Sequence, residues 1–364
     1  MDLNILYFDD EQPDLDRFGS LIEENSSSHY NLIVEKIIGT KVKKTPNILD
    51  NKSPDLILAD FDYSHVDSDG DVLGMNGVTL SNLFRQKFSH VPIVLFTRKP
   101  YEQRADFPHN EAILACIDDT KYKEDLIPPN HSNLIRYLIS IALGYKKLRD
   151  KEPKNWDNLI ALISAPESSY DVLKMSYPIE QAKRKTWTAF EAATWIRKTL
   201  LKFPGIVYEP VFTATYLGIT LDSFQLPEVQ TFFNPARYYG VFSDENDRWW
   251  KTKLIEVAAQ NMDETEKNLP LRKGFIKYWN RTHLQKLAPS VCEFKGDSPA
   301  ETVCYLSQRP AMLKYSLHYH VDIRPEVMDE ARVSFRSIIT RDDVNFDLFD
   351  EVARDIIKKR NLKP

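Results

Sequence analysis

The sequence has few cysteines, no excess of positive charge and no apolar run of membrane-spanning length. Three cysteines among 364 residues are too few for a disulfide framework. The formal net charge of −5 provides no overall positive field for nucleic acid or anionic lipid, although a local basic face stays open. The longest apolar stretch, residues 134–145, is too short to cross a bilayer.

The N-terminus also lacks the features of a signal peptide. MDLNILYFDD leads into an apolar strand and then into acid, without a basic start or a small-residue cleavage site. We therefore expect a cytoplasmic protein with no membrane segment. The 42% hydrophobic fraction is that of a folded chain, and 364 residues favour two domains over one core.

Short apolar runs alternate with helical patterns through the first 150 residues. Strands are predicted over residues 3–8, 30–38, 55–59, 91–96 and 113–117. Helical spacing covers residues 13–24, 79–88 and 132–148, with weaker helices near Thr45 and Tyr101. Five strands alternating with five helices predict an α/β fold, a doubly wound parallel sheet with its reactive site beyond the carboxyl ends of the strands.

The composition changes after residue 148. Residues 149–156, RDKEPKNW, are charged and contain a proline, which indicates a linker. Aromatic residues then become dense, and all six tryptophans lie after position 150. Helices are predicted over residues 182–202, 247–261, 272–287, 324–340 and 347–359, with a strand-like pattern over 299–321. We expect one domain at 1–148 and a second, mainly α in an α+β arrangement, at 157–364.

Acidic, hydroxyl and basic side chains occur where the predicted strands end. The sequence places them in the runs YFDD, PDLILAD, VPIVLFT and CIDDTK, as Asp9, Asp10, Asp60, Thr97 and Lys121. Clustered carboxylates repel one another and attract a hard divalent cation such as Mg2+. A phosphoryl group arriving at one carboxylate needs its charge neutralised, which a metal and a lysine can supply.

That order and spacing resemble the receiver domain of two-component response regulators over residues 1–148. The resemblance implies a flavodoxin-like fold with Asp60 as the phosphoacceptor. It implies Mg2+ as cofactor, held by Asp9, Asp10 and Asp60 with the backbone carbonyl of Asp62. It also implies a phosphohistidine on a histidine kinase or phosphotransfer protein as the donor. MNG at 75–77, followed by VTLSNLFRQ, is similar to the family's turn and third helix.

The same resemblance makes Thr97 the switch hydroxyl and Lys121 the lysine that pairs with phosphate. The chain also departs from the pattern, because the connection from residue 60 to 75 is long and rich in Asp, Ser and Gly. No proline follows Lys121, and no switch aromatic lies just upstream of it. Lys123 takes the lysine role if the fifth strand runs later. Two hypotheses stay open, a working phosphoacceptor and a degenerate receiver that keeps only the fold.

Two patterns raise the question of other metals. Aspartates at 67, 69 and 71 alternate as in an EF-hand, but the glycine falls at the fourth position and valine at the twelfth, so a solvated loop is favoured. Cys292, Cys304, His318 and His320 are candidate zinc ligands, and in a strand both histidines point to one face. Without a CxxC pair, buried cysteines and surface histidines are favoured over zinc.

Two patterns raise the question of nucleic acid. Residues 214–224, ATYLGITLDSF, have helix-turn-helix spacing, but the second helix carries acid and no base, so core packing is favoured. The runs RYY at 237–239 and RWWK at 248–251 interleave basic and aromatic residues. Packing is again favoured over stacking on single-stranded bases. A nucleic-acid partner is therefore not expected.

We expect a response-regulator-like signalling protein, a phosphoprotein of a two-component phosphorelay. In this hypothesis phosphorylation of Asp60 controls a C-terminal output or interaction domain, with homodimerisation as one route, and the receiver is not a turnover enzyme. The alternative is a degenerate receiver fused to an effector enzyme. Its polar candidates are His318, His320, Arg324, Asp329 and Arg332. A DNA-binding output ranks third.

Overall fold

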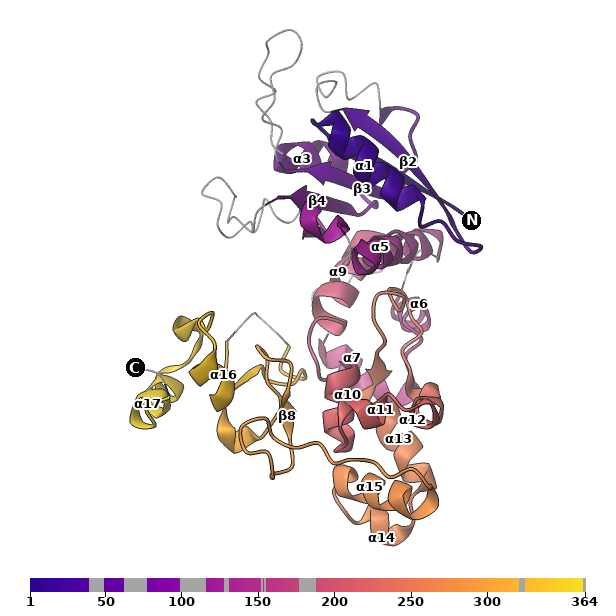
Figure 1. Ribbon diagram of the computed structural model, residues 1–364. Coiled ribbons are helices and arrows are strands. Elements are labelled where there is room, and N and C mark those ends of the chain that lie inside the picture. The colour runs from indigo at the N-terminus through magenta and orange to yellow at the C-terminus, as the bar shows by residue number, and fades with distance from the viewer. Residues whose placement is uncertain are drawn as a thin grey trace. The chain divides into compact units, whose positions relative to one another are not determined.

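The computed structural model describes residues 1–38, 49–61, 77–98, 116–127, 131–151, 153, 155–176, 188–320 and 325–362 (Figure 1). The chain forms two compact units. Unit 1 consists of Met1–Leu162, Arg184–Thr194 and Val241–Glu245. Unit 2 consists of Ile163–Lys183, Trp195–Gly240 and Asn246–Pro364.

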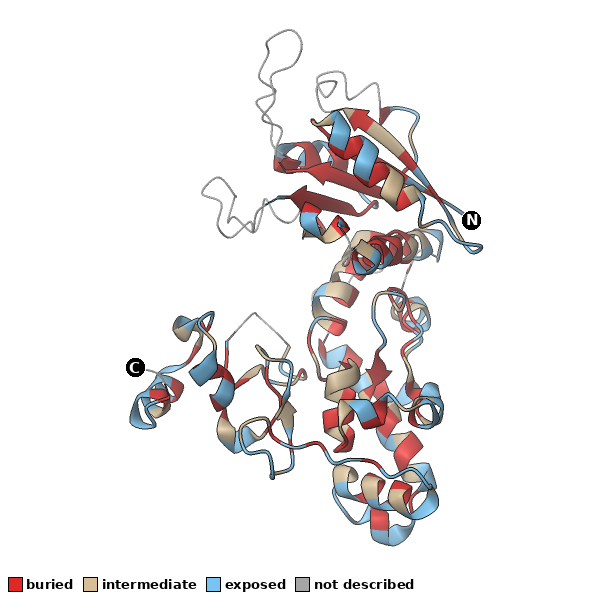
Figure 2. Ribbon diagram, viewed as in Figure 1, coloured by how far each residue is buried: buried red, intermediate tan, exposed pale blue. Residues whose placement is uncertain are grey.

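Unit 1 contains a five-stranded parallel sheet in the order β2-β1-β3-β4-β5. The strands are β1 (Asp2–Asp9), β2 (Asn31–Ile38), β3 (Leu56–Asp60), β4 (Ile93–Thr97) and β5 (Asp119–Tyr122). All residues of β3 and β4 are buried, as expected for central strands covered on both faces (Figure 2). This strand order is that of the doubly wound flavodoxin-like fold, and it has its switch point beside β1. The predicted receiver fold is therefore confirmed.

The helices of unit 1 follow from amphipathic spacing. They are α1 (Gln12–Glu23), α3 (Gly77–Lys87), the 3-10 turn η3 (Lys123–Leu126), α5 (His131–Lys151) and α6 (Trp156–Leu162); α9 (Ala189–Trp195) ends at the unit boundary. In α1, Leu15, Phe18 and Ile22 are buried at helical spacing behind a proline in the first turn. The predicted helices near Thr45 and Tyr101 fall on segments outside the described residues.

The fifth strand begins later than the sequence predicts. Residues 113–115 lie outside the described part of the chain, and Cys116 and Ile117 are not in a strand. The carbonyl of Cys116 accepts from the guanidinium of Arg85, and the Asp118 carboxylate accepts the Ile93 N–H at 2.8 Å. The ladder therefore starts only at Asp119. As an edge strand, β5 is half-buried throughout and has no apolar run to signal it.

Unit 2 is mainly helical, as the sequence predicts, and its described residues include three short antiparallel strand pairs. The pairs are β6 (Val207–Tyr208) with β7 (Trp249–Trp250), β8 (Thr302–Val303) with β9 (Pro310–Ala311), and β10 (Ser316–His318) with β11 (Arg332–Ser334). The helices are α7 (Tyr170–Ser176), α10 (Pro210–Leu217), α11 (Leu221–Phe224), α12 (Pro227–Phe232), α13 (Lys251–Asn261), α14 (Glu264–Lys267), α15 (Leu271–Thr282), α16 (Phe335–Thr340) and α17 (Glu351–Lys359). The described part of the unit also contains the short turns η4 (Glu167–Ser169), η6 (Asn234–Ala236), η7 (Leu313–Tyr315) and η8 (Phe346–Leu348) and the π-helical η5 (Ile196–Leu200).

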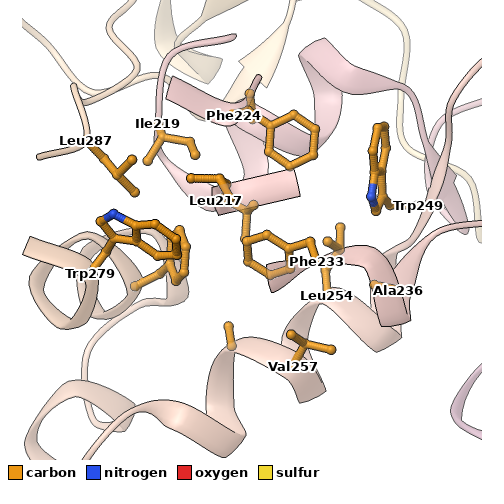
Figure 3. Close-up of a cluster of buried hydrophobic side chains, with 14 of the residues drawn as sticks. Leu217, Ile219, Phe224, Phe233, Ala236, Trp249, Leu254, Val257, Trp279 and Leu287 are labelled. Atoms are coloured by element: carbon orange, nitrogen blue, oxygen red, sulfur yellow. The ribbon is translucent and has the colours of Figure 1, made fainter. Parts of the chain in front are cut away.

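Aromatic side chains build the first core of unit 2. Figure 3 shows Phe224, Phe233, Trp249 and Trp279 around Leu217. Residues 214–224 do form a helix, a turn and a helix, with Gly218 in the left-handed conformation at φ 80°. However, α11 has only four residues and its Phe224 is fully buried. This segment thus packs in the core of unit 2.

The tryptophan pair also packs inward. Trp249 and Trp250 are 1% and 2% exposed, and they form β7, so α13 begins only at Lys251. Similarly, the helix predicted over 324–340 is replaced by β11 and the shorter α16, which begins after the capping residue Ser334. Within the described residues, no helix has the length and apolar character needed to cross a membrane.

Candidate functional site

Three carboxylates converge at the carboxyl edge of the unit 1 sheet. Asp9 is the last residue of β1 and Asp60 the last residue of the neighbouring β3, while Asp10 follows β1 directly. All three are buried, and one carboxylate oxygen from each lies within 4.8 Å of the others. The strands are parallel and adjacent, so their ends meet on one side and bring the acids together.

The lysine at this site is Lys123. Its side chain is buried, and its Nζ lies 2.8 Å from Asp9 Oδ2, 2.8 Å from Asp14 Oδ2 and 3.1 Å from Asp60 Oδ2. Lys121, the residue expected in this position, instead pairs with Asp119 at 3.1 Å and lies over the ring of Tyr137. The late position of β5 explains the difference, because Lys121 lies within the strand and Lys123 is the first residue after its end at Tyr122.

Asp14 is a site residue that the sequence analysis missed. It lies in the first turn of α1, and its carboxylate accepts from both Lys123 and Arg98, each at 2.8 Å. Arg98 also reaches Glu11 at 2.5 Å. An acid in the first turn of a helix is ordinary, since it interacts favourably with the helix dipole. Its position four residues after Asp10 was the only available signal.

Burial and crowding perturb the titration of this cluster. Burial first, then the charge of Asp9, raises the pKa of Asp60 to about 7, and Lys123 opposes that rise. Burial and the Asp9 carboxylate also raise the pKa of Tyr7, whose hydroxyl donates to Asp9 at 2.8 Å. Burial acts the same way on Asp14, but hydrogen bonds from Lys123 and Arg98 outweigh it and lower the pKa.

The residues present fit a hard divalent cation. Asp9, Asp10 and Asp60 lie together in a buried cluster, and burial followed by the charge of Asp9 raises the pKa of Asp60. Oxygen-only ligands of this kind suit Mg2+. Asp9 Oδ1 accepts one backbone N–H from Glu11 at 3.0 Å, which leaves it a second lone pair. Asp62, expected to add its carbonyl, lies outside the described residues.

Two small residues shape the rim. Thr97 ends β4 and is 1% exposed, and it is the register partner of Tyr122 in β5. Gly77 begins α3 and donates its N–H to the carbonyl of Phe61 at 2.9 Å. A Cβ on Gly77 would lie 2.3 Å from the carbonyl oxygen of Asp60. The predicted turn before the third helix thus needs a glycine where it contacts the strand bearing Asp60.

The candidate zinc residues of unit 2 separate into two groups. Cys292 and Cys304 are buried, and Cys304 Sγ lies 3.2 Å from the hydroxyl of Ser337. His318 and His320 have ligand atoms within 4.8 Å of Asp350, and the group contains neither cysteine. The preference for buried cysteines is confirmed, whereas the two histidines gather with a carboxylate that the sequence analysis did not connect to them. The aspartates at 67, 69 and 71 lie outside the described residues.

Asp329, one of the effector-enzyme candidates, lines two cavities in unit 2. Their volumes are about 150 and 270 Å3, and both are also lined by Phe212 and Val303. The Asp329 carboxylate accepts from the Tyr208 hydroxyl at 2.6 Å and from Lys251 at 3.2 Å. The other candidates divide: Arg332 lines the larger cavity, Arg324 lies outside the described residues, and the two histidines line neither cavity.

Comparison with known proteins finds similarity only among solved structures. No family model matches the chain, and no curated protein matches it. A response regulator receiver protein from Sinorhizobium medicae is 16% identical, with a TM-score of 0.29, over 39% of this chain and 96% of its own. A response regulator from Thermotoga maritima in complex with Mg(2+)-BeF is 17% identical, with a TM-score of 0.27, over 38% and 98%.

An adenylate cyclase structure from Rhodopirellula baltica is 14% identical, with a TM-score of 0.31, over 42% of this chain and 95% of its own. TM-scores of this size do not establish the fold of the chain. The receiver fold of unit 1 follows instead from its own strand order and parallel pairing.

Proposed function

We propose that unit 1 is a Mg2+-dependent phosphoacceptor, with Asp60 receiving a phosphoryl group from a phosphohistidine of a partner kinase or phosphotransfer protein. The observation that carries this proposal is the buried cluster of Asp9, Asp10 and Asp60. With it goes Lys123, whose Nζ lies 3.1 Å from Asp60 Oδ2. We place this exchange in the cytoplasm, within a two-component phosphorelay.

In the proposed reaction an oxygen of the Asp60 carboxylate forms a bond to phosphorus. The bond from phosphorus to the donor imidazole nitrogen breaks, and the imidazole leaves with the electron pair. Lys123 holds a positive charge beside the transferred oxygens, and burial raises its effect by excluding water. A divalent cation held by Asp9, Asp10 and Asp60 supplies further charge neutralisation when it is bound.

The acceptor must be ionised to attack, but the buried cluster by itself favours the protonated acid. Without added positive charge, burial and Asp9 keep the pKa of Asp60 at about 7. A cation among the acids favours the carboxylate form and lowers this pKa. We assign Thr97, buried at the end of β4, as the hydroxyl that follows the phosphoryl oxygens. In this proposal, phosphorylation controls an output or interaction domain formed by residues 157–364.

The proposal is tested by labelling the full chain with acetyl phosphate and Mg2+. We expect a hydroxylamine-sensitive mass increase of one phosphoryl group, mapped to the peptide with Asp60. Asp60→Asn should abolish it, while Asp16→Asn, an exposed aspartate on α1, should label like the natural chain. Equal labelling of the Asp60 variant would show that another residue accepts. An unlabelled natural chain would favour the degenerate receiver.

A second candidate function, an effector enzyme in unit 2, rests on the cavities around Asp329. Lys251 and Tyr208 both contact this carboxylate, so charged and hydroxyl groups meet at a hollow surface. Burial, followed by the charge of Asp329, raises the pKa of Tyr208. If these cavities hold a small molecule, Asp329→Asn should weaken its binding in a metabolite-library thermal shift assay. A library without any hit on the natural chain would remove this candidate.

A further inference from the structure

Two histidines share the outer face of one strand in unit 2. Along β10 and the residue pair after it, Leu317 and Tyr319 are buried in the second core of the unit. His318 and His320 alternate with them, so their rings lie on the opposite side of the chain. The two ring centroids are 4.3 Å apart. Strand periodicity therefore places two imidazoles side by side on a partly exposed surface.

The core beneath that strand brings a carboxylate to the same place. The buried ring of Tyr319 packs against the ring of Phe349 at 4.9 Å between centroids. The N–H of His320 donates to the carbonyl of Leu348 at 2.8 Å. These two contacts hold the end of β10 beside the chain that enters α17. Asp350, which follows Phe349 in the sequence, is thereby placed beside the two histidines.

The Asp350 carboxylate is also oriented. Asp350 is the N-cap of α17, and its Oδ1 accepts the N–H of Ala353 at 2.6 Å. The cap bond restricts rotation of the side chain and leaves Oδ2 available to bind an ion together with the histidines. Arg332, the cross-strand partner of His318, donates to Ser316 Oγ at 3.0 Å and to Leu313 O at 3.2 Å. Its charge is thus directed toward the start of β10, away from His320.

We propose that His318, His320 and Asp350 form a binding site for a divalent transition metal of the zinc class. One ligand atom of each lies within 4.8 Å of the others. Ligand atoms about 2.0–2.2 Å from a tetrahedral ion are closer together than this, and small side-chain rotations bring them there. Two imidazoles and one carboxylate suit a borderline ion rather than Mg2+. Three protein ligands on an exposed surface leave a fourth position open to water or substrate.

The test is a Zn2+ titration of the tag-free full chain against a chromophoric chelator, with Mg2+ present in excess. We expect one tight site per chain. His320→Ala should weaken Zn2+ binding at least tenfold, whereas His90→Ala, which removes an exposed histidine of unit 1, should leave it unchanged. Asp350→Asn is the sharper variant, because asparagine keeps the helix cap but removes the charge. It should also weaken binding, with circular dichroism unchanged.

Co2+ in place of Zn2+ adds a spectroscopic readout. A tetrahedral site should produce visible absorption bands that His320→Ala removes and His90→Ala retains. Asp60→Asn should bind Zn2+ like the natural chain, and His320→Ala should still accept a phosphoryl group from acetyl phosphate. The metal-site proposal and the phosphoacceptor proposal are therefore tested independently of each other. Equal Zn2+ affinity in the His320 and His90 variants, or no binding at all, would overturn the proposal.

Discussion

The two groups of candidate metal ligands in the described part of the chain differ in burial and charge. Asp9, Asp10 and Asp60 are buried in unit 1, where like charges repel strongly and Lys123 is already in place. His318, His320 and Asp350 are half-buried or exposed in unit 2, where water can solvate them. The stability of the buried cluster therefore depends on the positive charge of Lys123 and of any bound metal ion. The exposed cluster should destabilise the fold little when no metal is bound.

The largest effect should come from removing the buried cation. Lys123→Met leaves Asp9, Asp14 and Asp60 without their shared partner, and we expect unit 1 to lose about 3–5 kcal/mol without Mg2+. Hydrogen exchange in β1 and β3 measures this. Lys121→Met is the matched control, because its partly exposed pair with Asp119 should contribute about 1 kcal/mol or less. Equal effects of the two variants would contradict the assignment of the site lysine.

The next largest effect should be a dependence of the stability of unit 1 on pH, caused by the buried Asp60. Asp60 has its pKa raised from 3.8 to about 7, so the folded state favours the protonated acid. This group therefore lowers stability progressively as the pH rises from about 4 to 7, by at most about 4 kcal/mol. Asp60→Asn removes the penalty.

We expect Asp60→Asn to be more stable than the natural chain at pH 8 without Mg2+, with the difference shrinking toward pH 4. The pKa of Asp14 is lowered, so its titration affects stability only below this pH range and does so in both proteins. Mg2+ should narrow the difference at pH 8 by stabilising the natural chain. Hydrogen exchange of β3 across this pH range provides the measurement, and a difference independent of pH would show that Asp60 titrates normally.

A smaller effect should follow from crowding the strand that bears the acceptor. Gly77→Ala places a Cβ 2.3 Å from the Asp60 carbonyl oxygen, and overpacking of this kind costs about 1–3 kcal/mol. Labelling of Asp60 should slow as the strand end shifts. Gly296→Ala is the control in unit 2, since its Cβ would meet nothing within 4 Å. Undiminished labelling in the Gly77 variant would mean that the strand end tolerates the shift.

The smallest effect concerns the exposed cluster without metal. Asp350→Ala removes the N-cap of α17 and should destabilise that helix by about 1 kcal/mol, while Asp350→Asn should cost a few tenths at most. Hydrogen exchange in residues 351–359 reports the difference. If the two variants behaved alike, the carboxylate charge and not the cap bond would be what holds the start of the helix.

The sequence predicted most of unit 1 because its strands are buried and apolar. Four of the five predicted strands overlap β1 to β4, and Asp9, Asp10 and Asp60 lie together. The fifth was misplaced, since β5 at the sheet edge reads DTKY and carries no apolar run. That shift also moved the lysine from 121 to 123. The domain limits at 148 and 157, the homodimer and the roles of the site residues stay predictions.

The sequence by itself determined the parallel sheet and the side on which its acids gather, because strand burial and strand ends are local patterns that alternate along the chain. Only the tertiary structure decided which lysine reaches Asp60, that Asp14 joins it, and that Asp350 meets His318 and His320. Those groupings depend on where an edge strand starts and on a Tyr319–Phe349 contact across the core. Residues far apart along the chain leave no mark of such contacts in the local pattern on which sequence prediction depends.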